Sequence, residues 1–589
     1  MIASLLTGIF WLFATLNPYW KKYDFGGEFP VVILLTFLNL FLVILAFRKL
    51  RSRFNLGDIF LGIFLLAITI SFIFSQAWGI GLSEYLTFSG AVLTYFILSR
   101  TPKLNTQTLY TIIKIGTLAA IAVGFYFYLT APEPRMFGPF LDLDLKSMRW
   151  PNAFALFLLL TWPIFLIRRS PSLFSFLFSL FSLSLTFSAL LLTFSRGALI
   201  AFAGQIFILA IFQIKYITKR TLFTAATIAA LTLLIFTTAN HLRQAETIQV
   251  AERLNFENNE QLTSKNERQE FWQGSIQLIS QNPFFGSGPF TFRYAYNPIQ
   301  PSLLATSDHP HNLFLKIAVE NGLIAAASLL LFFLYLATRT LQTLFTKHPE
   351  NRCEIILLSI AILGALAHNL IDYNLNFLAN LLPLFIYLAI LNRINQPATK
   401  PANYTLFLLF SFFFFLFAFF SHLSPQKFYP INYHLSLADQ AIQNQDYPQT
   451  IQLIDQHLKT NTLDSQAYYL RAVAKTNLNQ DPLTDFERAL TLNPKNQFIY
   501  HFSYLQTETD PAKLQTQIPK TAALLQDYFF YVQENIHYTA QTNNVADAAL
   551  TIDLLTGPLR SYLPAEQRQS LIEGKAQMLK DAEEWREGS

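Results

Sequence analysis

Residues 309–337 read HPHNLFLKIAVENGLIAAASLLLFFLYLA, so two histidines and an asparagine directly precede a long apolar run. The run is long enough for a membrane helix, which needs about 20 apolar residues. Titratable side chains are costly inside lipid, so their position at the start of the run is informative. Asn312, Lys316 and Glu320 recur every four residues and predict one polar face of a short helix. The Asn-Gly pair ending at Gly322 predicts a break before the buried span.

The composition indicates a polytopic membrane protein. Of 589 residues, 52% are hydrophobic and only 13% are charged, and the mean hydropathy is +0.33, which is too apolar for a soluble chain of this length. Cys353 is the single cysteine, which excludes an intrachain disulfide and argues against a cysteine-based metal site. The N-terminal stretch MIASLLTGIFWLFATL has no basic leader or cleavage site, so we expect a retained first span.

Apolar stretches of sufficient length predict thirteen spans, at 3–20, 29–47, 57–78, 82–99, 107–130, 151–167, 172–194, 198–214, 221–239, 313–338, 354–370, 376–392 and 403–422. Alternate connections are basic and belong to one side: Arg48, Lys49, Arg51, Arg53, Arg100, Lys103, Arg168, Arg169, Lys215, Lys219, Arg220, Arg339, Lys347, Arg352, Arg393 and Lys400. The positive-inside rule makes that side cytoplasmic. The N-terminus is then cytoplasmic, and loops 131–150 and 240–312, the Arg196 turn, the tip at Asp372 and the C-terminal tail lie outside.

The tail differs in composition and predicts a second domain. Segments 433–465 and 464–496 each read as two short amphipathic helices, and Pro448 and Pro482 lie 34 residues apart. This period is typical of tetratricopeptide repeats, which stack into solenoids. The expected fold class is therefore all-α, with about 12–13 transmembrane helices in residues 1–425 and an extracytoplasmic, tetratricopeptide-like domain in residues 430–589.

The outer loop 240–312 is too long for a simple connection. Its segment SKNERQEFWQGSIQLI begins with a capping box at Ser264 and Glu267. It predicts a helix that carries Arg268 near Trp272, with an apolar stripe formed by Phe271, Trp272, Ile276 and Ile279. The following QNPFFGSGPF predicts a backbone break whose N–H groups could meet an anion.

Several polar residues on the predicted outer face are candidate site residues: Arg135, Arg149, Asn152, Arg196, Arg268, Trp272, His309, His311, Asn312, Glu320 and Asp372. Arginines without matching carboxylates favour a phosphate or diphosphate, which guanidinium groups bind in a bidentate manner. A histidine can act as a base near neutral pH. The alternatives stay open: interfacial arginines also reach lipid phosphates, histidines also cap helices, Glu320 can pair with Lys316, and Asp372 can anchor its hairpin.

Five segments together resemble the O-antigen ligase and polymerase family over about residues 1–395. They are HPHNLFLKIAVENGLIAAASLLLFF, TFSRGALIAF, NERQEFWQGSIQLISQNPFFGSGPF, the RWPNAFALFLLLTWP element and AHNLIDYNL. The resemblance implies a glycosyltransferase of the bacterial cytoplasmic membrane that needs no metal or other cofactor. Its donor would be a glycan on a polyprenyl diphosphate carrier, such as undecaprenyl diphosphate. Arg196 and Arg268 match the arginines assigned to the diphosphate, and His311 matches the base, with His309 as a second candidate.

The acceptor remains open at this stage. A ligase would use a lipid-linked glycan, a polymerase another carrier-linked glycan, and a protein O-oligosaccharyltransferase a protein, which the tail could help to select. A small-solute transporter is the alternative of another class, but it would place ionisable groups near the centres of the spans. The centres of the predicted spans are nearly uncharged, and Lys114 is the main exception. This pattern favours an interfacial enzyme. No nucleic acid partner is expected.

Overall fold

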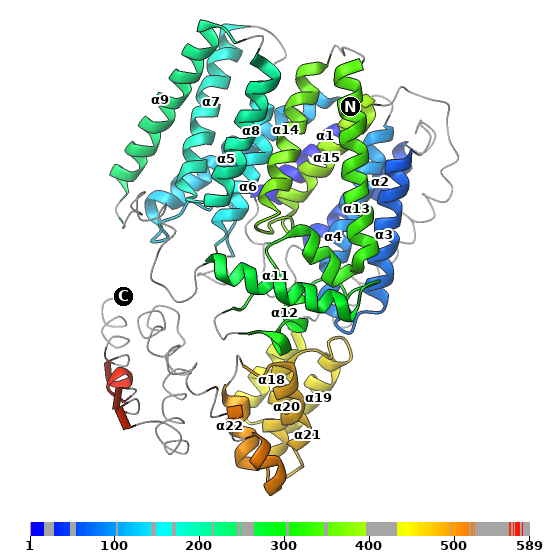
Figure 1. Ribbon diagram of the computed structural model, residues 1–589, viewed down its shortest axis with the longest axis vertical. Helices are drawn as coiled ribbons and strands as arrows, with labels where there is room; N and C mark the ends of the chain where they lie inside the picture. Colours follow the sequence, from blue (N-terminus) through cyan, green and yellow to red (C-terminus); the bar gives the residue numbers. More distant parts are fainter. Residues whose placement is uncertain are drawn as a thin grey trace. The chain divides into compact units, whose positions relative to one another are not determined.

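The computed structural model describes residues 2–16, 29–46, 55–101, 104–142, 149–167, 172–214, 217–243, 264–301, 305–346, 351–395, 433–495 and 498–517, with a few isolated residues beyond them. These residues form helices and no named strand. The chain divides into two compact units (Figure 1). Unit 1 comprises Met1–Glu260, Asn282–Phe290 and His309–Tyr429, and unit 2 comprises Gln261–Gln281, Thr291–Asp308 and Pro430–Ser589.

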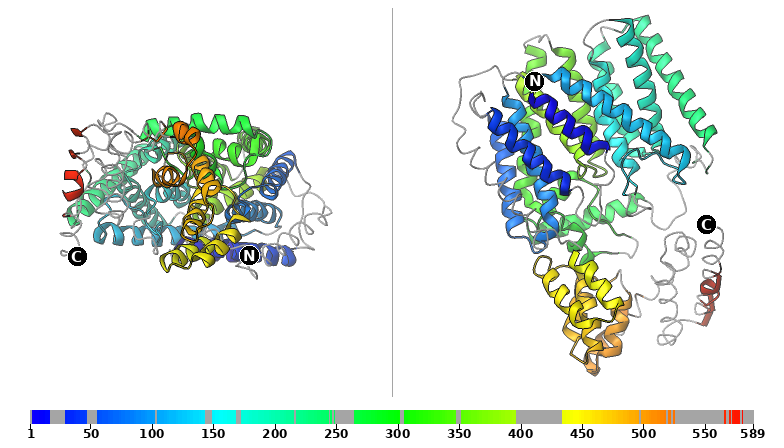
Figure 2. Two further views of the ribbon diagram at one scale, coloured as in Figure 1. Left: turned by 90° about the horizontal axis from the view of Figure 1, so that it is seen from below. Right: turned by 180° about the vertical axis from the view of Figure 1, so that it is seen from behind.

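Unit 1 contains the apolar helices. They are α1 (Ile2–Leu16), α2 (Phe29–Ala46), α3 (Leu56–Ile73), α4 (Trp78–Arg100), α5 (Thr106–Thr130), α6 (Pro151–Thr161) with the 3-10 helix η2 (Trp162–Leu166), α7 (Leu173–Leu192), α8 (Arg196–Gln213), α9 (Lys219–Leu242), α13 (Leu313–Thr346), α14 (Arg352–His368) and α15 (Leu378–Asn395). Among the pairs that pack side by side are α1 with α5, α3 with α13, α4 with α15, and α7 with α9 (Figures 1 and 2).

Eight described helices are long and apolar enough to span a membrane: α3, α4, α5, α7, α8, α9, α13 and α15. Each of the first twelve predicted spans coincides with a helix, but α1, α6 and α14 have only 15, 11 and 17 residues. α6 ends where η2 begins, and Pro163 is the second residue of η2. Proline lacks the N–H that would continue an α-helix. The predicted span 403–422 lies outside the described residues.

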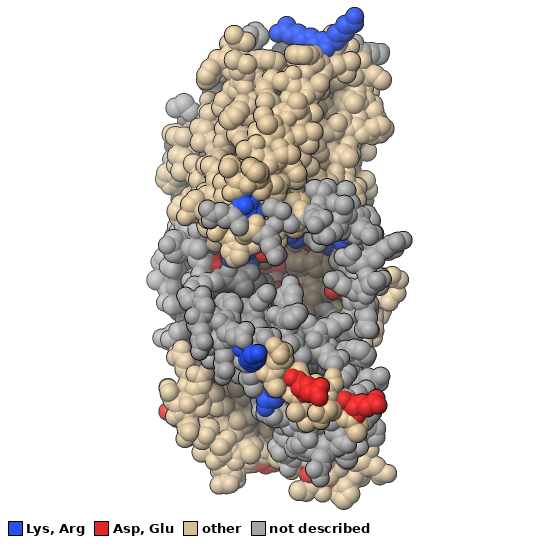
Figure 3. Space-filling view, turned by 90° about the vertical axis from the view of Figure 1, so that its left-hand side faces the viewer, with Lys and Arg blue, Asp and Glu red and all other residues tan. Residues whose placement is uncertain are grey.

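The outer surface of these helices suits contact with lipid. Phe174, Phe223 and Leu234 on α7 and α9 are 79%, 74% and 61% exposed. Large apolar side chains on this scale are costly in water and favourable in hydrocarbon. In Figure 3, a broad tan surface without charged side chains lies between lysines or arginines at its upper edge and further charged side chains at its lower margin. These features support a multi-pass membrane protein.

The connections of unit 1 gather at two opposite ends. At one end, Arg100 at the end of α4 pairs with Asp58 at the start of α3 at 2.7 Å, and Asn55 bonds to Asn392 of α15 at 3.0 Å. At the other end, the α3–α4, α5–α6, α7–α8 and α14–α15 connections meet the start of α13, as described below. This grouping agrees with the predicted alternation of connections, while the assignment of either end to the cytoplasm stays a prediction.

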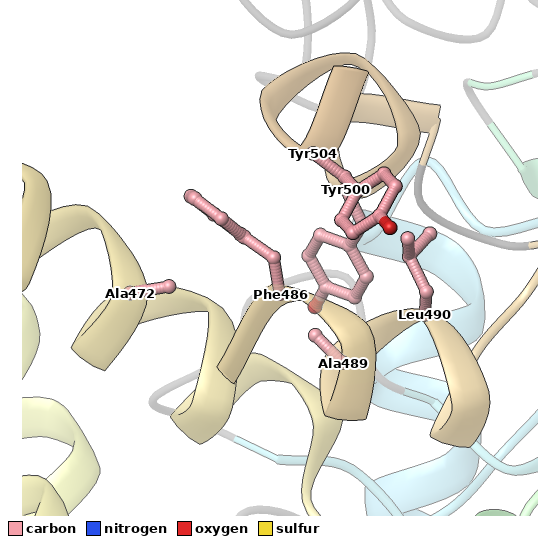
Figure 4. Packing of buried hydrophobic residues seen from close by; sticks show 6 residues of the cluster. All are labelled: Ala472, Phe486, Ala489, Leu490, Tyr500 and Tyr504. Carbon is pink, nitrogen blue, oxygen red and sulfur yellow. The ribbon is translucent and has the colours of Figure 1, made fainter. Parts of the chain in front are cut away.

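Unit 2 combines outer-loop helices with the tail. The loop supplies α11 (Ser264–Gln281), α12 (Phe292–Ala295) and the 3-10 helix η4 (Asn297–Ile299), and the tail supplies α18 (Tyr433–Gln443), α19 (Tyr447–Leu458), α20 (Ser465–Asn477), α21 (Leu483–Leu492) and α22 (Phe498–Thr507). Consecutive tail helices pack on one another. α20, α21 and α22 share a core of Ala472, Phe486, Ala489, Leu490, Tyr500 and Tyr504 (Figure 4). The paired helices agree with the sequence pattern, and their identity as tetratricopeptide repeats stays a prediction.

The apolar stripe predicted for α11 was partly wrong. Phe271 is buried, but Ile276 is 64% exposed. The buried face instead follows Phe271, Gly274, Ser275 and Leu278, which have the spacing of one helical face. Gly274 and Ser275 belong to this buried face, because the Tyr296 ring packs closely against Gly274. The polarity of the residues alone does not predict this contact.

Candidate functional site

The segment before α13 is held against the end of α14. Asn312 caps α13, because its Oδ1 accepts the Leu315 N–H at 3.0 Å. The Asn312 amide donates to the Leu370 carbonyl at 2.8 Å, and the Leu313 N–H donates to the Asn369 carbonyl at 2.8 Å. The preceding His311 has φ of 51°, a left-handed conformation that is uncommon for residues other than glycine and that occurs often at functional sites. These bonds hold the imidazole in place at the start of the helix.

A chain of hydrogen bonds joins four residues that the sequence singled out. His311 Nδ1 lies 2.7 Å from Asp372 Oδ1. The other Asp372 oxygen, Oδ2, accepts the Asn152 amide at 2.8 Å. Arg135 Nη2 donates to Asn152 Oδ1 at 2.6 Å, and Arg135 Nε donates to the Thr193 carbonyl at 2.9 Å. Connections that are far apart in the sequence are therefore brought together at one end of unit 1.

This chain fixes the role of each His311 nitrogen. A neutral imidazole bonded to a carboxylate through Nδ1 carries its proton there, which leaves Nε2 as an acceptor. Asp372 is 5% exposed and also accepts the Tyr373 N–H through Oδ1 at 2.8 Å, so its position is well determined. His311 itself is 26% exposed. The arrangement can orient a general base and stabilise the imidazolium that forms when the base takes up a proton.

His309 packs beside this pair. Its ring centroid lies 4.8 Å from that of His311 and 5.0 Å from that of Tyr373. Burial, followed by the charge of His311, lowers the pKa of His309. His309 is therefore neutral at pH 7 and adds no positive charge beside His311. Burial likewise raises the pKa of the Tyr373 hydroxyl well above its ordinary value, so this hydroxyl stays protonated.

A buried ionic cluster lies at the same end, and the sequence reasoning missed one member. Lys316 Nζ is 2.6 Å from Glu84 Oε1 and also pairs with Glu320. All three side chains are almost fully buried, and Lys316 lies over the Tyr373 ring at 5.0 Å. The pairing of Glu320 with Lys316 was anticipated. The signal for Glu84 was a lone carboxylate inside an apolar span, where a paired or functional role is the default interpretation.

The glycine-rich segment 283–290 packs against the break in α13. Gly322 has φ of 83° and interrupts the helix, as the sequence predicted. The Ser287 and Gly288 N–H groups donate to the carbonyls of Val319 and Glu320 at 3.0 and 2.8 Å. The Phe290 N–H donates to Glu320 Oε2 at 3.0 Å. These three N–H groups therefore satisfy acceptors at the interrupted helix, one of them the Glu320 carboxylate. An anion of the substrate as a partner of this segment's backbone stays a prediction.

Gly322→Ala is expected to destabilise unit 1 by roughly 1–3 kcal/mol or more, since a left-handed non-glycine residue adds strain of that size. A Cβ at this position would also lie 2.0 Å from the Phe284 carbonyl oxygen. Thermal unfolding of the detergent-solubilised protein measures the effect. Gly204→Ala is the matched control, because a Cβ there meets nothing within 4 Å. Equal unfolding temperatures for the two variants would contradict this account of the break.

The remaining predicted residues lie in different places. Arg196 is the first residue of α8 and is half-buried. A Cβ on the neighbouring Gly197 would lie 2.7 Å from the Ile371 side chain, so the start of α8 adjoins the segment that ends in Asp372. Arg149 instead stacks over the Phe137 ring at 5.3 Å. Arg268 and Trp272 lie on α11 in unit 2 and are half-buried, so their proximity to His311 stays a prediction.

The described residues contain no group of three or more His, Cys, Asp or Glu side chains that could hold a metal ion. A comparison with curated proteins gives no match. A comparison with protein families finds that residues 181–330, about a quarter of the chain, match the family model described as O-antigen ligase. The matched stretch includes Arg196, Arg268, His309, His311, Asn312 and Glu320. At the level of this family, the match supports a membrane protein that transfers glycans.

Proposed function

We propose that the protein moves a glycan from a polyprenyl diphosphate carrier to an acceptor hydroxyl at the outer face of the bacterial cytoplasmic membrane, most closely as an O-antigen ligase does. The observation that carries this proposal is the hydrogen-bonded chain from His311 through Asp372 and Asn152 to Arg135. This chain lies where helix ends meet, so it suits a lipid-borne substrate. The isoprenoid can stay in hydrocarbon while its diphosphate and glycan lie in water.

The proposed reaction is a single in-line displacement. His311 Nε2 takes the proton of the acceptor hydroxyl, and the oxygen attacks the anomeric carbon of the donor glycan. The bond from that carbon to the diphosphate oxygen breaks, and polyprenyl diphosphate leaves with the bonding electrons. The configuration at the anomeric carbon is inverted. No metal is required in this scheme, because cationic side chains offset the charge of the leaving group.

Each site residue has a proposed role. Arg196 and Arg268 bind the diphosphate, and Asp372 holds the His311 ring in the required tautomer. Asn152 and Arg135 hold Asp372, while Asn312 caps the helix that follows the base. Glu320 belongs to the buried cluster with Lys316, and Tyr373 and His309 pack behind the base. Trp272 remains a candidate contact of the glycan, whereas Arg149 stacks on the Phe137 ring instead.

The buried charges bear on the transporter alternative. Glu84 lies in α4 and Lys316 lies in α13. The apolar helices therefore hold buried ionisable groups in addition to Lys114. However, Lys316 lies in the first turn of α13, and Glu84 is the seventh residue of α4. Both positions are near the end that carries His311 rather than near the middle of the helices, which favours an enzyme site over a transport path.

Reconstitution in vesicles tests the proposed function. The protein is incubated with a polyprenyl diphosphate-linked glycan and one of three acceptors: a glycolipid, a second carrier-linked glycan or a protein. Transfer to the glycolipid is the expected result for a ligase, whereas the other products identify a polymerase or a protein O-oligosaccharyltransferase. Chromatography of the labelled glycan measures its loss from the carrier. If the glycan stays on its carrier with all three acceptors, the proposal is wrong.

A further inference from the structure

The C-terminal helices of unit 2 contact the chain's own outer loop. Lys495 Nζ, just after α21, donates to the Pro301 carbonyl at 2.6 Å. The 3-10 helix η4 packs on α21. The sequence pattern suggested a docking surface without naming its occupant, and these contacts identify one occupant as loop residues 291–308.

A second set of contacts joins this loop to the connection between α19 and α20. Asp464 caps α20, since its Oδ1 accepts the Gln466 N–H at 3.0 Å, and its Oδ2 lies 2.9 Å from His457 Nε2. The Asp464 carboxylate also interacts electrostatically with Tyr294 and Arg293 of the loop. His457 and Asp464 are 0% and 5% exposed, so this connection is a rigid support for the loop.

The same loop packs on α11, which carries Arg268 and Trp272. The Phe271 ring of α11 lies edge-on to the Tyr296 ring, with centroids 5.6 Å apart. A Cβ added to Gly274 would lie 2.5 Å from the Tyr296 ring, so α11 approaches this ring closely. Tyr296 in turn stacks on Phe292 at 5.1 Å. A continuous series of packed groups therefore runs from the tail through α12 to α11.

We propose that the tail helices α19 to α21 bind loop 291–308 and thereby position α11 for the transfer reaction. This inference rests on the proposed function, in which Arg268 of α11 binds the donor diphosphate. The tail is then a part of the transferase rather than a separate domain for an external partner. Residues Lys495 and Tyr294 act as positioning residues, because they reach Arg268 only through α12 and α11.

Two full-length variants test the inference from opposite sides of the contact. Tyr294→Ala removes a loop side chain that interacts electrostatically with Asp464, and Lys495→Ala removes the donor to Pro301. Each variant should speed amide hydrogen exchange in α11 roughly tenfold, because lost packing and a lost hydrogen bond favour local opening. Exchange in α20 should stay unchanged, which shows that the tail remains folded. Lys495→Arg should restore the slow exchange, since a guanidinium can also donate to the carbonyl.

Lys513→Ala is the matched control. Lys513 is a tail lysine that is 48% exposed, and it pairs with two other tail residues, Glu487 at 2.8 Å and Glu508 at 3.4 Å. Unchanged exchange of α11 in both Tyr294→Ala and Lys495→Ala would overturn the inference. Donor and acceptor KM values separate the two proposals. Faster exchange with a higher donor KM supports both, whereas faster exchange with wild-type kinetics supports the positioning of α11 and contradicts the role of Arg268.

Discussion

His311→Ala is expected to lower the rate of glycan transfer by about 10²–10⁴-fold, the usual contribution of a positioned general base. The physical reason is that the variant removes the proposed base, which takes the proton of the acceptor while Asp372 stabilises the imidazolium. The fold should persist, because Asn312 still caps α13 and still bonds to Leu370. Single-turnover transfer with carrier-linked glycan in vesicles measures the loss.

Two variants make this result specific. Asp372→Asn keeps the shape of the partner but removes the charge that stabilises the imidazolium, so activity should fall while thermal stability changes less than for Gly322→Ala. His309→Ala should reduce transfer less than His311→Ala does, because His311 is the histidine bonded to Asp372, whereas the His309 ring packs against His311 and Tyr373. If His309→Ala is the more damaging change, then the base is His309.

Arg196→Ala is expected to reduce transfer by about 10²–10³-fold, the range found when one preorganised stabilising group is removed from a transition state. Arg196 begins α8 beside the segment that ends in Asp372, where its guanidinium can offset the charge on the departing diphosphate. Arg196→Lys should recover only part of the activity, since an ammonium lacks the planar pair of donors. Steady-state transfer at varied donor concentration measures the effect.

Arg149→Ala is the control for the loss of a positive charge at the same end of unit 1. Arg149 stacks on Phe137 and does not belong to the hydrogen-bonded chain, so its removal should change transfer far less. Full activity in Arg196→Ala, with normal protein levels, would contradict the diphosphate role. A similar loss in Arg196→Ala and Arg149→Ala would instead indicate a general effect of surface charge on donor concentration.

The sequence determined the helical fold to a large extent. Apolar runs located the helices of unit 1, because burying about 20 residues of backbone in lipid requires internal hydrogen bonds. The break at Gly322 followed from the Asn-Gly pair, and the helix predicted from Ser264 onward coincides with α11. These features depend on neighbouring residues, so a single sequence carries them. Residue chemistry likewise selected His311, Asp372, Asn152 and Arg135 as candidates.

Only the tertiary structure decided which of these residues meet. Asp372 was predicted either as a site residue or as an anchor of its hairpin, and the structure places its Oδ1 2.7 Å from His311 Nδ1. Glu84 pairs with Lys316 across 232 positions of sequence, and the N–H groups of Ser287, Gly288 and Phe290 bond to α13. Hydropathy and spacing give the length and the polar face of a helix. They do not give the rotation of each helix about its axis or the depth at which helices pack. A hydrogen bond depends on both, because its length is limited to a range of a few tenths of an ångström.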